Sequence, residues 1–222
     1  MYKIETHLHT THTSKCGHLD AETIARAYKN AGYDAIIVTD HYSRITFDYL
    51  NVNLYDNSDK LTPFLKGYHM LTEEGKKLGL RIYRGAELRF DECDNDYLLY
   101  GYFDNLLADP AKVFAMGIAE FSRHAQQAGA LIIQAHPYRK SCTPAIACYI
   151  DGVEVNNRNP RHDNHNDMAQ KYADDHGLIA TCGSDCHQTT DIALGGIQTE
   201  SLPKDNINMA RLIRHRKFIN LV

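Results

Sequence analysis

The segment ETHLHTTHTSKCGH, residues 5–18, holds four histidines in fourteen positions near the start of the chain. A β-strand repeats the direction of its side chains every two residues, so His7 and His9 point to the same face if this segment is extended. Two imidazoles at this spacing can bind one metal ion together. The segment therefore predicts part of a metal site, which residues from elsewhere in the chain must complete.

Further residues with the chemistry of metal ligands stand where later apolar runs end. They are His41 after AIIVTD, Glu87 in GAEL, His136 in AHP, and Asp185 with His187 in GSDCH. Each of them, taken singly, is better explained as a turn residue or a solvated carboxylate. Five separate segments that end in His, Glu or Asp are hard to explain in that way, so we interpret them as one site.

Imidazole and carboxylate ligands with no required thiolate suit zinc, manganese or iron. A carboxylate can bridge two ions, and two ions roughly 3.5–4 Å apart can clamp a phosphoryl group. We expect Glu87 to be this bridge, because a central negative charge lowers the electrostatic cost of two neighbouring cations. Asp40, next to His41, either orients a ligand histidine through a hydrogen bond or caps a loop.

The elements that must position these residues follow a βα rhythm, which is typical of a largely parallel sheet. Strands are expected at 2–9, 35–41, 81–88, 96–103, 130–137, 152–157 and 178–187. Helices are expected at 19–33, 62–79, 110–129, 165–177 and 204–216, and a long loop beside the site at 42–60. Seven strands fit a barrel better than an open sheet, and the ligands stand at the carboxyl ends of the strands, where parallel βα barrels build their sites.

The bulk properties of the chain exclude several classes of protein. Its 222 residues show no linker-like stretch, so one domain over residues 1–222 is expected. A formal net charge of −4 provides no basic field for extended duplex nucleic acid. No segment has the pattern of a signal peptide or a membrane span, and the six cysteines include no C-x-x-C pair. We expect a soluble cytoplasmic protein with reduced thiols and no membrane partner.

The motifs HLH, TDH, AHP and GSDCH, in this order, resemble those of the PHP superfamily, named for polymerase and histidinol phosphatase. The resemblance runs from His7 to about Gly196, and HLHTTHTSKCGH is similar to the first motif of the histidinol-phosphatase-like branch. HPYR, VEVNNRNPRH and GSDCH are similar to motifs of small stand-alone members described as metal-dependent phosphoesterases. The resemblance implies a distorted (β/α)7 barrel with two or three divalent transition metal ions (Zn, Mn or Fe) on its C-terminal face.

The resemblance also implies how the ligands are shared between the ions. The first ion is held by His7, His9, Glu87 and Asp185. Glu87 bridges to a second ion, to which His136 contributes.

A third ion occurs in trinuclear members, and His18, His41 and His187 match the positions that hold it. His12 competes with His18 for this role, and we favour His18 because CGH matches the family pattern better. One departure concerns the second ion, because trinuclear relatives place another histidine near the fourth strand, where DYLLYGYFD has none. A centre with two ions, or with a loosely held third, stays open.

Guanidinium groups are the natural partners for a phosphate, because they pair with its oxygens bidentately. Arg139 follows His136 in HPYR, and Arg158 and Arg161 flank the loop NNRNPRH. We expect these three arginines to include a phosphate clamp, with His162 as a further substrate-binding residue.

The leading hypothesis is a phosphoester hydrolase in which a metal-activated hydroxide attacks phosphorus, with Glu87, Asp185 and His187 as catalytic residues. Its substrate would be a small phosphorylated metabolite or nucleotide, so a phosphomonoesterase and a nucleotidase or short-oligonucleotide exonuclease are both open. The alternatives are a metal-dependent amidohydrolase and a non-catalytic metal-binding module. Against the amidohydrolase, no lysine that could be carbamylated stands at a strand end, since Lys140 follows HPYR in an expected loop.

Overall fold

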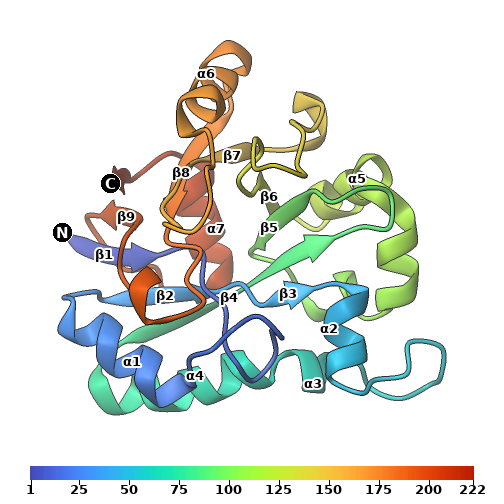
Figure 1. The fold of residues 1–222 in the computed structure, drawn as a ribbon, viewed down its shortest axis with the longest axis horizontal. Coiled ribbons are helices and arrows are strands. Elements are labelled where there is room, and N and C mark those ends of the chain that lie inside the picture. Colours follow the sequence, from blue (N-terminus) through green and yellow to red (C-terminus); the bar gives the residue numbers. More distant parts are fainter.

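The computed structural model describes residues 1–222 and contains ten strands and seven α-helices (Figure 1). The strands are β1 (Tyr2–Glu5), β2 (Ala35–Val38), β3 (His41–Tyr42), β4 (Arg81–Arg89), β5 (Asp96–Tyr100), β6 (Leu131–Gln134), β7 (Gly152–Asn157), β8 (Ile179–Gly183), β9 (Gly196–Thr199) and β10 (Ile219–Leu221). The helices are α1 (Ala21–Asn30), α2 (Arg44–Tyr49), α3 (Leu61–Phe64), α4 (Lys66–Leu78), α5 (Pro110–Gln127), α6 (Asn166–His176) and α7 (Asn206–Arg214). Short 3-10 turns occur at η1 (Asp104–Leu106), η2 (Ala147–Tyr149) and η3 (Thr189–Asp191).

The strands form one sheet in the order β10-β9-β1-β2-β4-β5-β6-β7-β8, with β3 paired to β4. The pairs β1–β2, β2–β4, β6–β7 and β7–β8 are parallel, and the register places Ile4 beside Ala35 and Gly152 beside Ile179. All seven expected strands are present. The fold is a nearly closed, distorted barrel, as the sequence predicts.

The barrel closes differently at its two ends. At the amino end of β1, β9 pairs antiparallel with β1, and β10 pairs with β9, so these two short strands lie between β1 and β8. Beyond β1 the chain stays extended, and Leu8 forms a parallel bridge to Cys186 in the segment after β8. His9 N donates to Cys186 O at 2.9 Å and Cys186 N donates to His7 O at 3.1 Å. The barrel is therefore closed directly at the carboxyl ends of β1 and β8.

The direction of β5 was not anticipated. It runs antiparallel to both β4 and β6. The connection from Arg89 to Asp96 is too short for a crossover, so β4 and β5 form a hairpin. Reversal of one strand places its amino end, which begins at Asp96, among the carboxyl ends of the other strands.

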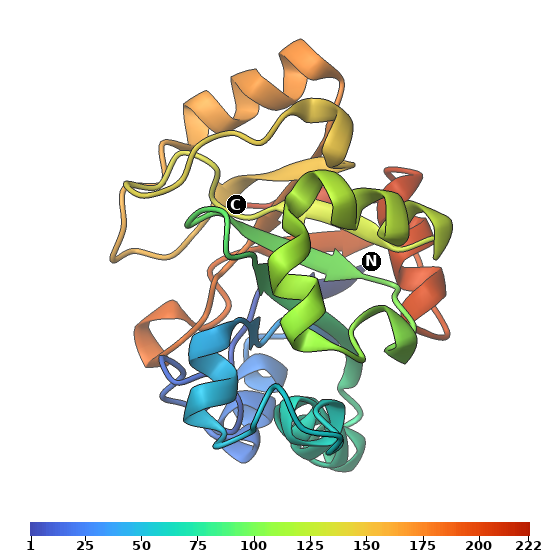
Figure 2. The same cartoon turned by 90° about the vertical axis from the view of Figure 1, so that its right-hand side faces the viewer.

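The helices cover the outside of the strands, as the two perpendicular views show (Figures 1 and 2). Inside, Ile4, Ile37, Tyr100 and Ile133 belong to one buried apolar cluster, against which α7 packs. A second cluster joins α1 and α4 to the outer face of β2, and a third lies beneath α2, α5 and α6. None of the helices has the length and apolar composition needed to cross a bilayer.

The expected helix 110–129 is kinked at Gly117, where φ is 69° and ψ is 170°. Two other helical predictions need correction. The expected loop 42–60 contains α2, which Ser43 caps by accepting a hydrogen bond from Thr46 N. The expected helix 62–79 is split into α3 and α4 at Leu65. Both differences concern short helices that tertiary packing supports, since Phe47 and Phe64 are buried and stack on each other at 6.3 Å.

Candidate metal centre

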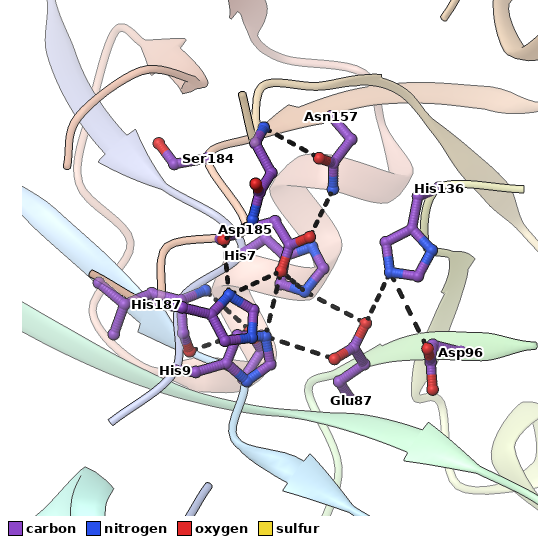
Figure 3. A network of polar contacts seen from close by, with 12 residues as sticks. His7, His9, Glu87, Asp96, His136, Asn157, Ser184, Asp185 and His187 are labelled. Carbon is purple, nitrogen blue, oxygen red and sulfur yellow. Dashed lines mark hydrogen bonds and ion pairs between the residues drawn. The ribbon is translucent and has the colours of Figure 1, made fainter. Parts of the chain in front are cut away.

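The side chains singled out at the strand ends converge on the end of the barrel that is closed by the Leu8–Cys186 bridge (Figure 3). His7 and His9 lie on the extension of β1, His41 in β3 and Glu87 in β4. The remaining members follow β6 and β8 and are His136, Asp185 and His187. All except His41 are buried, so the sheet brings polar groups from five strand ends into a water-poor site.

Glu87 lies at the centre of this cluster, as Figure 3 shows, and is fully buried. Its Oε1 is 3.2 Å from both His7 Nε2 and His136 Nε2. Its Oε2 is 2.8 Å from His41 Nδ1 and 3.3 Å from His9 Nε2. Each oxygen therefore faces two imidazoles, which is the arrangement that a bridging carboxylate needs.

Asp185 is the second carboxylate of the cluster. Its Oδ1 lies 3.5 Å from His7 Nε2 and 3.5 Å from His9 Nε2, and its Oδ2 accepts a 2.6 Å hydrogen bond from Arg139 Nη2. Asp185 and His136 both have positive φ, 50° and 31°, a conformation that costs energy for residues other than glycine. Such strain is characteristic of side chains held in place by a functional site.

A layer of acceptors behind the histidines fixes their tautomers. His7 Nδ1 lies 3.0 Å from Glu154 Oε1, and His187 Nδ1 lies 2.8 Å from Asp185 O. A carboxylate and a carbonyl can only accept, so both Nδ1 atoms carry the proton and both Nε2 atoms are free to bind a metal. His9 Nδ1 approaches Ser14 Oγ at 3.4 Å, and Ser14 donates to Asp40 at 2.7 Å. Asp40 therefore orients His9 through Ser14.

The donor set fits divalent metal ions. His7 Nε2, His9 Nε2 and Glu87 Oε2 are fully buried polar atoms without a hydrogen-bond partner. Unpaired buried polar groups are costly, and these three point toward one another. The ligand atoms of His7, His9 and Asp185 lie within 4.8 Å of one another, as do those of His9, His41 and His187. Cations between these groups would satisfy all three unpaired atoms.

The charges of the metal-free cluster shift its pKa values strongly. Burial alone would raise the pKa of Glu87, but His7 and His41 outweigh it and hold the pKa well below its usual value. Burial lowers the pKa of His7, yet the surrounding carboxylates raise it well above the ordinary value. For His136, hydrogen bonds with Cys142 and Glu87 overcome burial and raise the pKa to about 9. The buried carboxylates and imidazoles therefore favour each other's charged forms.

Asp96 is a member of the cluster that the sequence interpretation missed. Its Oδ2 is 3.9 Å from His136 Nε2, and it forms a third group of close ligand atoms with His41 and Glu87. Asp96 also binds Arg89 through two hydrogen bonds. It stands where trinuclear relatives were expected to place a further histidine, so a second ion would have an additional carboxylate available.

Glu154 was missed as well. It lies in the middle of β7, is 1% exposed and accepts hydrogen bonds from His7 and from Asn157 Nδ2 at 2.8 Å. The signal was present in the sequence, because a carboxylate within the apolar run GVEV needs a buried partner.

The two histidines that competed for the third ion lie apart from the cluster. His18 is exposed, and only its backbone N is tied to the site, by a 2.8 Å hydrogen bond to His187 O. The half-buried His12 accepts a 3.2 Å hydrogen bond from Ala21 N at the start of α1. Neither imidazole is grouped with His41 and His187. The exposed thiol of Cys16 is not grouped with them either.

The neighbouring imidazoles nevertheless change the acidity of Cys16. Burial raises the pKa of its thiol, but the contacts with His187 and His41 outweigh burial and lower the pKa to about 6. Thiolates form readily in such positive surroundings.

The predicted substrate residues differ in how closely they approach the cluster. Half-buried Arg139 reaches Asp185, Asn157 and Asn164 through Nε and Nη2, and its Nη1 has no partner. His162 lies at the surface, where partial burial and then the nearby charge of Arg139 lower its pKa.

The other two arginines do not contact the cluster. Arg161 donates to Asp191 Oδ2 at 2.8 Å, and the same oxygen accepts from His187 N at 3.0 Å, so Arg161 braces the loop that carries His187. Arg158 is exposed, and its side chain lies against Gly195. Of the three arginines, only Arg139 contacts a carboxylate of the cluster, that of Asp185.

The comparison with family models agrees with this geometry, because the model of the PHP domain matches residues 5–216. This chain belongs to the PHP domain family. The PHP domain thus accounts for nearly the whole chain. No curated protein matches it.

Solved structures similar to this PHP domain share its fold. A two-domain protein from Bacteroides vulgatus ATCC 8482, which contains a predicted PHP-like metal-dependent phosphoesterase, matches with a TM-score of 0.70 and 18% identity over 99% of this chain. The chain spans 64% of the length of that protein, less than two thirds. PsfC from Pseudomonas syringae PB-5123 matches with a TM-score of 0.66 and 17% identity over 99% of this chain and 91% of its own.

An amidohydrolase from Chromobacterium violaceum, with bound sulfate and no metal, is also similar, with a TM-score of 0.55 and 15% identity over 98% of this chain and 97% of its own. At these identities the structural comparisons establish a shared fold.

Proposed function

We propose that this PHP-domain protein is a metal-dependent phosphoester hydrolase that acts on a small phosphorylated metabolite or nucleotide. The observation that carries the proposal is the position of Glu87, a fully buried carboxylate whose two oxygens face four imidazoles, two of which, His7 and His9, have buried Nε2 atoms without a hydrogen-bond partner. His7, His9, Glu87 and Asp185 would hold a first ion, and Glu87, His136 and Asp96 would hold a second. Divalent Zn, Mn or Fe bound there would act as a Lewis acid and supply a nucleophile from water at neutral pH.

The chain's own residues would bind and orient the substrate. His41 and His187 are the ligand side chains that reach solvent, 22% and 10% exposed, so the phosphoryl group would approach over them. Arg139 lies on Asp185 with Nη1 unpaired, and a guanidinium in this position can take a phosphoryl oxygen. Its positive charge would stabilise the charge that develops in the transition state.

The amidohydrolase alternative has less support from this chain. A carbamylated lysine that bridges two ions would have to lie among the ligands, and Lys140 is exposed on the loop after His136. Glu87, which lies 3.2 Å from His7 Nε2 and 3.3 Å from His9 Nε2, would take the place of the bridge. The formal net charge of −4 also favours a small substrate, because it provides no positive potential that would attract a long polyanion.

The test is an activity screen on protein loaded separately with Mn, Zn and Fe. The assay compares four proteins: the wild type, Glu87→Gln, Asp185→Asn and the control Glu120→Gln, which lies on the exposed face of α5. Each is given phosphomonoesters, nucleotides, phosphodiesters and amides as substrates. We expect metal-dependent phosphate release that falls by at least about 100-fold in the two site variants and is unchanged in the control. Cleavage of amides alone, or turnover that survives Glu87→Gln, would overturn the proposal.

A further inference from the structure

We propose that the substrate carries a second anionic group, a carboxylate or a further phosphate, and that Arg89 and Lys15 bind this group in a pocket beside the metal centre. The inference deepens the proposed function and rests on it, because it names the chemistry of the molecule that the same site would take. It makes Arg89 and Lys15 the residues that select the substrate.

Strand β4 directs Arg89 to the same face as Glu87. The two residues are two positions apart, so their side chains point the same way and start about 6–7 Å apart along the strand. Arg89 stands opposite Asp96 in the β4–β5 hairpin, and its Nε and Nη2 donate to the two oxygens of that carboxylate. Its Nη1 has no partner in the chain, and the side chain is 36% exposed. Arg89 therefore has donors free for a ligand at the rim of the cluster.

The metal centre is thus flanked by two guanidinium groups of the same kind. Arg139 donates to Asp185, as Arg89 donates to Asp96, and each arginine keeps its Nη1 unpaired. Arg139, which follows β6, is the proposed partner of the phosphoryl group that reacts. Arg89, on β4, is then available for another negative group of the same molecule.

A pocket of about 400 Å³ opens beside Arg89, and this volume is typical of sites for small molecules. His41 separates the pocket from the centre, since it lines the pocket while its Nδ1 lies 2.8 Å from Glu87 Oε2. Lys15 and Arg89 both line the pocket, and no carboxylate does. In a chain with a net charge of −4, a pocket with two cations and no acidic group favours an anion.

The loop between β1 and α1 holds Lys15 at this pocket. The hydroxyl of Ser14 donates to Asp40 at 2.7 Å and accepts from His41 N at 3.0 Å, so the residue before Lys15 is fixed to the backbone of β3. Lys15 itself is exposed and forms no ion pair. Ile45, which is 59% exposed, adds an apolar surface to the same pocket. The pocket therefore suits a short carbon chain that ends in a negative group.

The experiment measures, by calorimetry, how the zinc-loaded full chain binds three phosphonates, which a phosphoester hydrolase cannot cleave. Butylphosphonate has one anionic group, 4-phosphonobutyrate adds a carboxylate, and butane-1,4-diphosphonate adds a second phosphonate. The proteins are the wild type, Arg89→Gln, Lys15→Gln and the control Lys204→Gln, whose lysine is exposed on the segment before α7. Each ligand is compared with butylphosphonate on the same protein, so an effect of Arg89→Gln on the metal centre through Asp96 cancels.

We expect the wild type to bind at least one of the doubly anionic ligands about 10-fold or more tightly than butylphosphonate. This preference should fall about 10-fold in Arg89→Gln, which loses a charged hydrogen-bond donor, and about threefold in Lys15→Gln, which loses an exposed charge. It should persist in Lys204→Gln. The ligand that the wild type binds more tightly, the carboxylate or the diphosphonate, identifies the second group.

Equal affinity for the three ligands, no binding of any of them, or a preference that survives both pocket substitutions would overturn the inference. Phosphoester turnover measured on the same samples separates this result from the proposed function. Turnover with equal affinities would reject only the second anionic group. A preference that depends on Arg89 and Lys15, without any phosphoester turnover, would reject the proposed activity and leave the anion pocket in place.

Discussion

Glu154 offers the sharpest test of how the chain prepares its ligands. Its two oxygens act only as acceptors: Oε1 faces His7 Nδ1 at 3.0 Å, and Oε2 accepts from Asn157 Nδ2 at 2.8 Å and from His136 N at 3.3 Å. Glu154→Gln keeps the shape of the side chain but turns one oxygen into a donor. The new amide must then face a donor, whichever way it is oriented.

The expected loss follows from this geometry. A hydrogen bond to a charged group contributes about 1.5–3 kcal/mol, which corresponds to a change of about 10- to 100-fold in a binding constant. Removing an outer partner of a metal-bound histidine has an effect of the same size. Because Glu154 also holds the proton on His7 Nδ1, we expect Glu154→Gln to weaken metal binding by this factor and to lower kcat/KM in parallel at limiting metal.

The assay is competition for metal with a chromophoric chelator, with folding monitored by circular dichroism. Glu120→Gln, on the exposed side of α5, is the matched control and should bind metal like the wild type. A folded Glu154→Gln protein with unchanged metal affinity would refute the claim that Glu154 prepares His7 as a ligand.

The remaining predictions concern the second ion, the packing behind His7 and the competition between metal and protons. Asp96→Asn should lower the amount of bound metal by about one ion per chain while the first site stays filled, and elemental analysis would measure this loss. If the variant binds as much metal as the wild type, Asp96 is not a ligand. Gly183→Ala should reduce both metal affinity and Tm, since a Cβ there lies 2.6 Å from Glu154 Oε1 and from His7 Cβ; a wild-type Tm and affinity would contradict this packing. The pKa of His136 is raised to about 9 and that of His7 is also raised, so protons compete with metal ions for these imidazoles near neutral pH. Metal binding should therefore release protons and become stronger as the pH rises, which calorimetry in buffers of different ionisation enthalpy would detect. Metal binding without any proton release would contradict the raised pKa values.

Much of the centre could be predicted because its residues obey strand geometry. His7 and His9 are two residues apart on an extended segment, Glu87 lies near the carboxyl end of β4, and His136 follows the buried strand β6. The carboxyl ends of parallel strands meet, so these residues meet as well. Local pattern and topology agree at these positions.

The rest depends on tertiary structure that a single sequence does not specify. Asp96 enters the site because β5 is reversed, which places the amino end of that strand where the other strands finish. Cys16 and His18 are two residues apart on a loop without periodicity, so their directions depend on the contacts of the loop with Thr10 and His187. Motif spacing could therefore not show that the imidazole of His18 lies apart from the cluster.

The central claim is that the buried cluster around Glu87 is a multinuclear metal centre that drives phosphoester hydrolysis. It is tested most directly by elemental analysis of the reconstituted protein, with turnover of an aryl phosphate measured on the same sample. The account predicts more than one transition metal ion per chain, with activity that rises with occupancy and is lost when a chelator removes the metal. Less than about half an equivalent of bound metal after reconstitution, or full activity without metal, would contradict it.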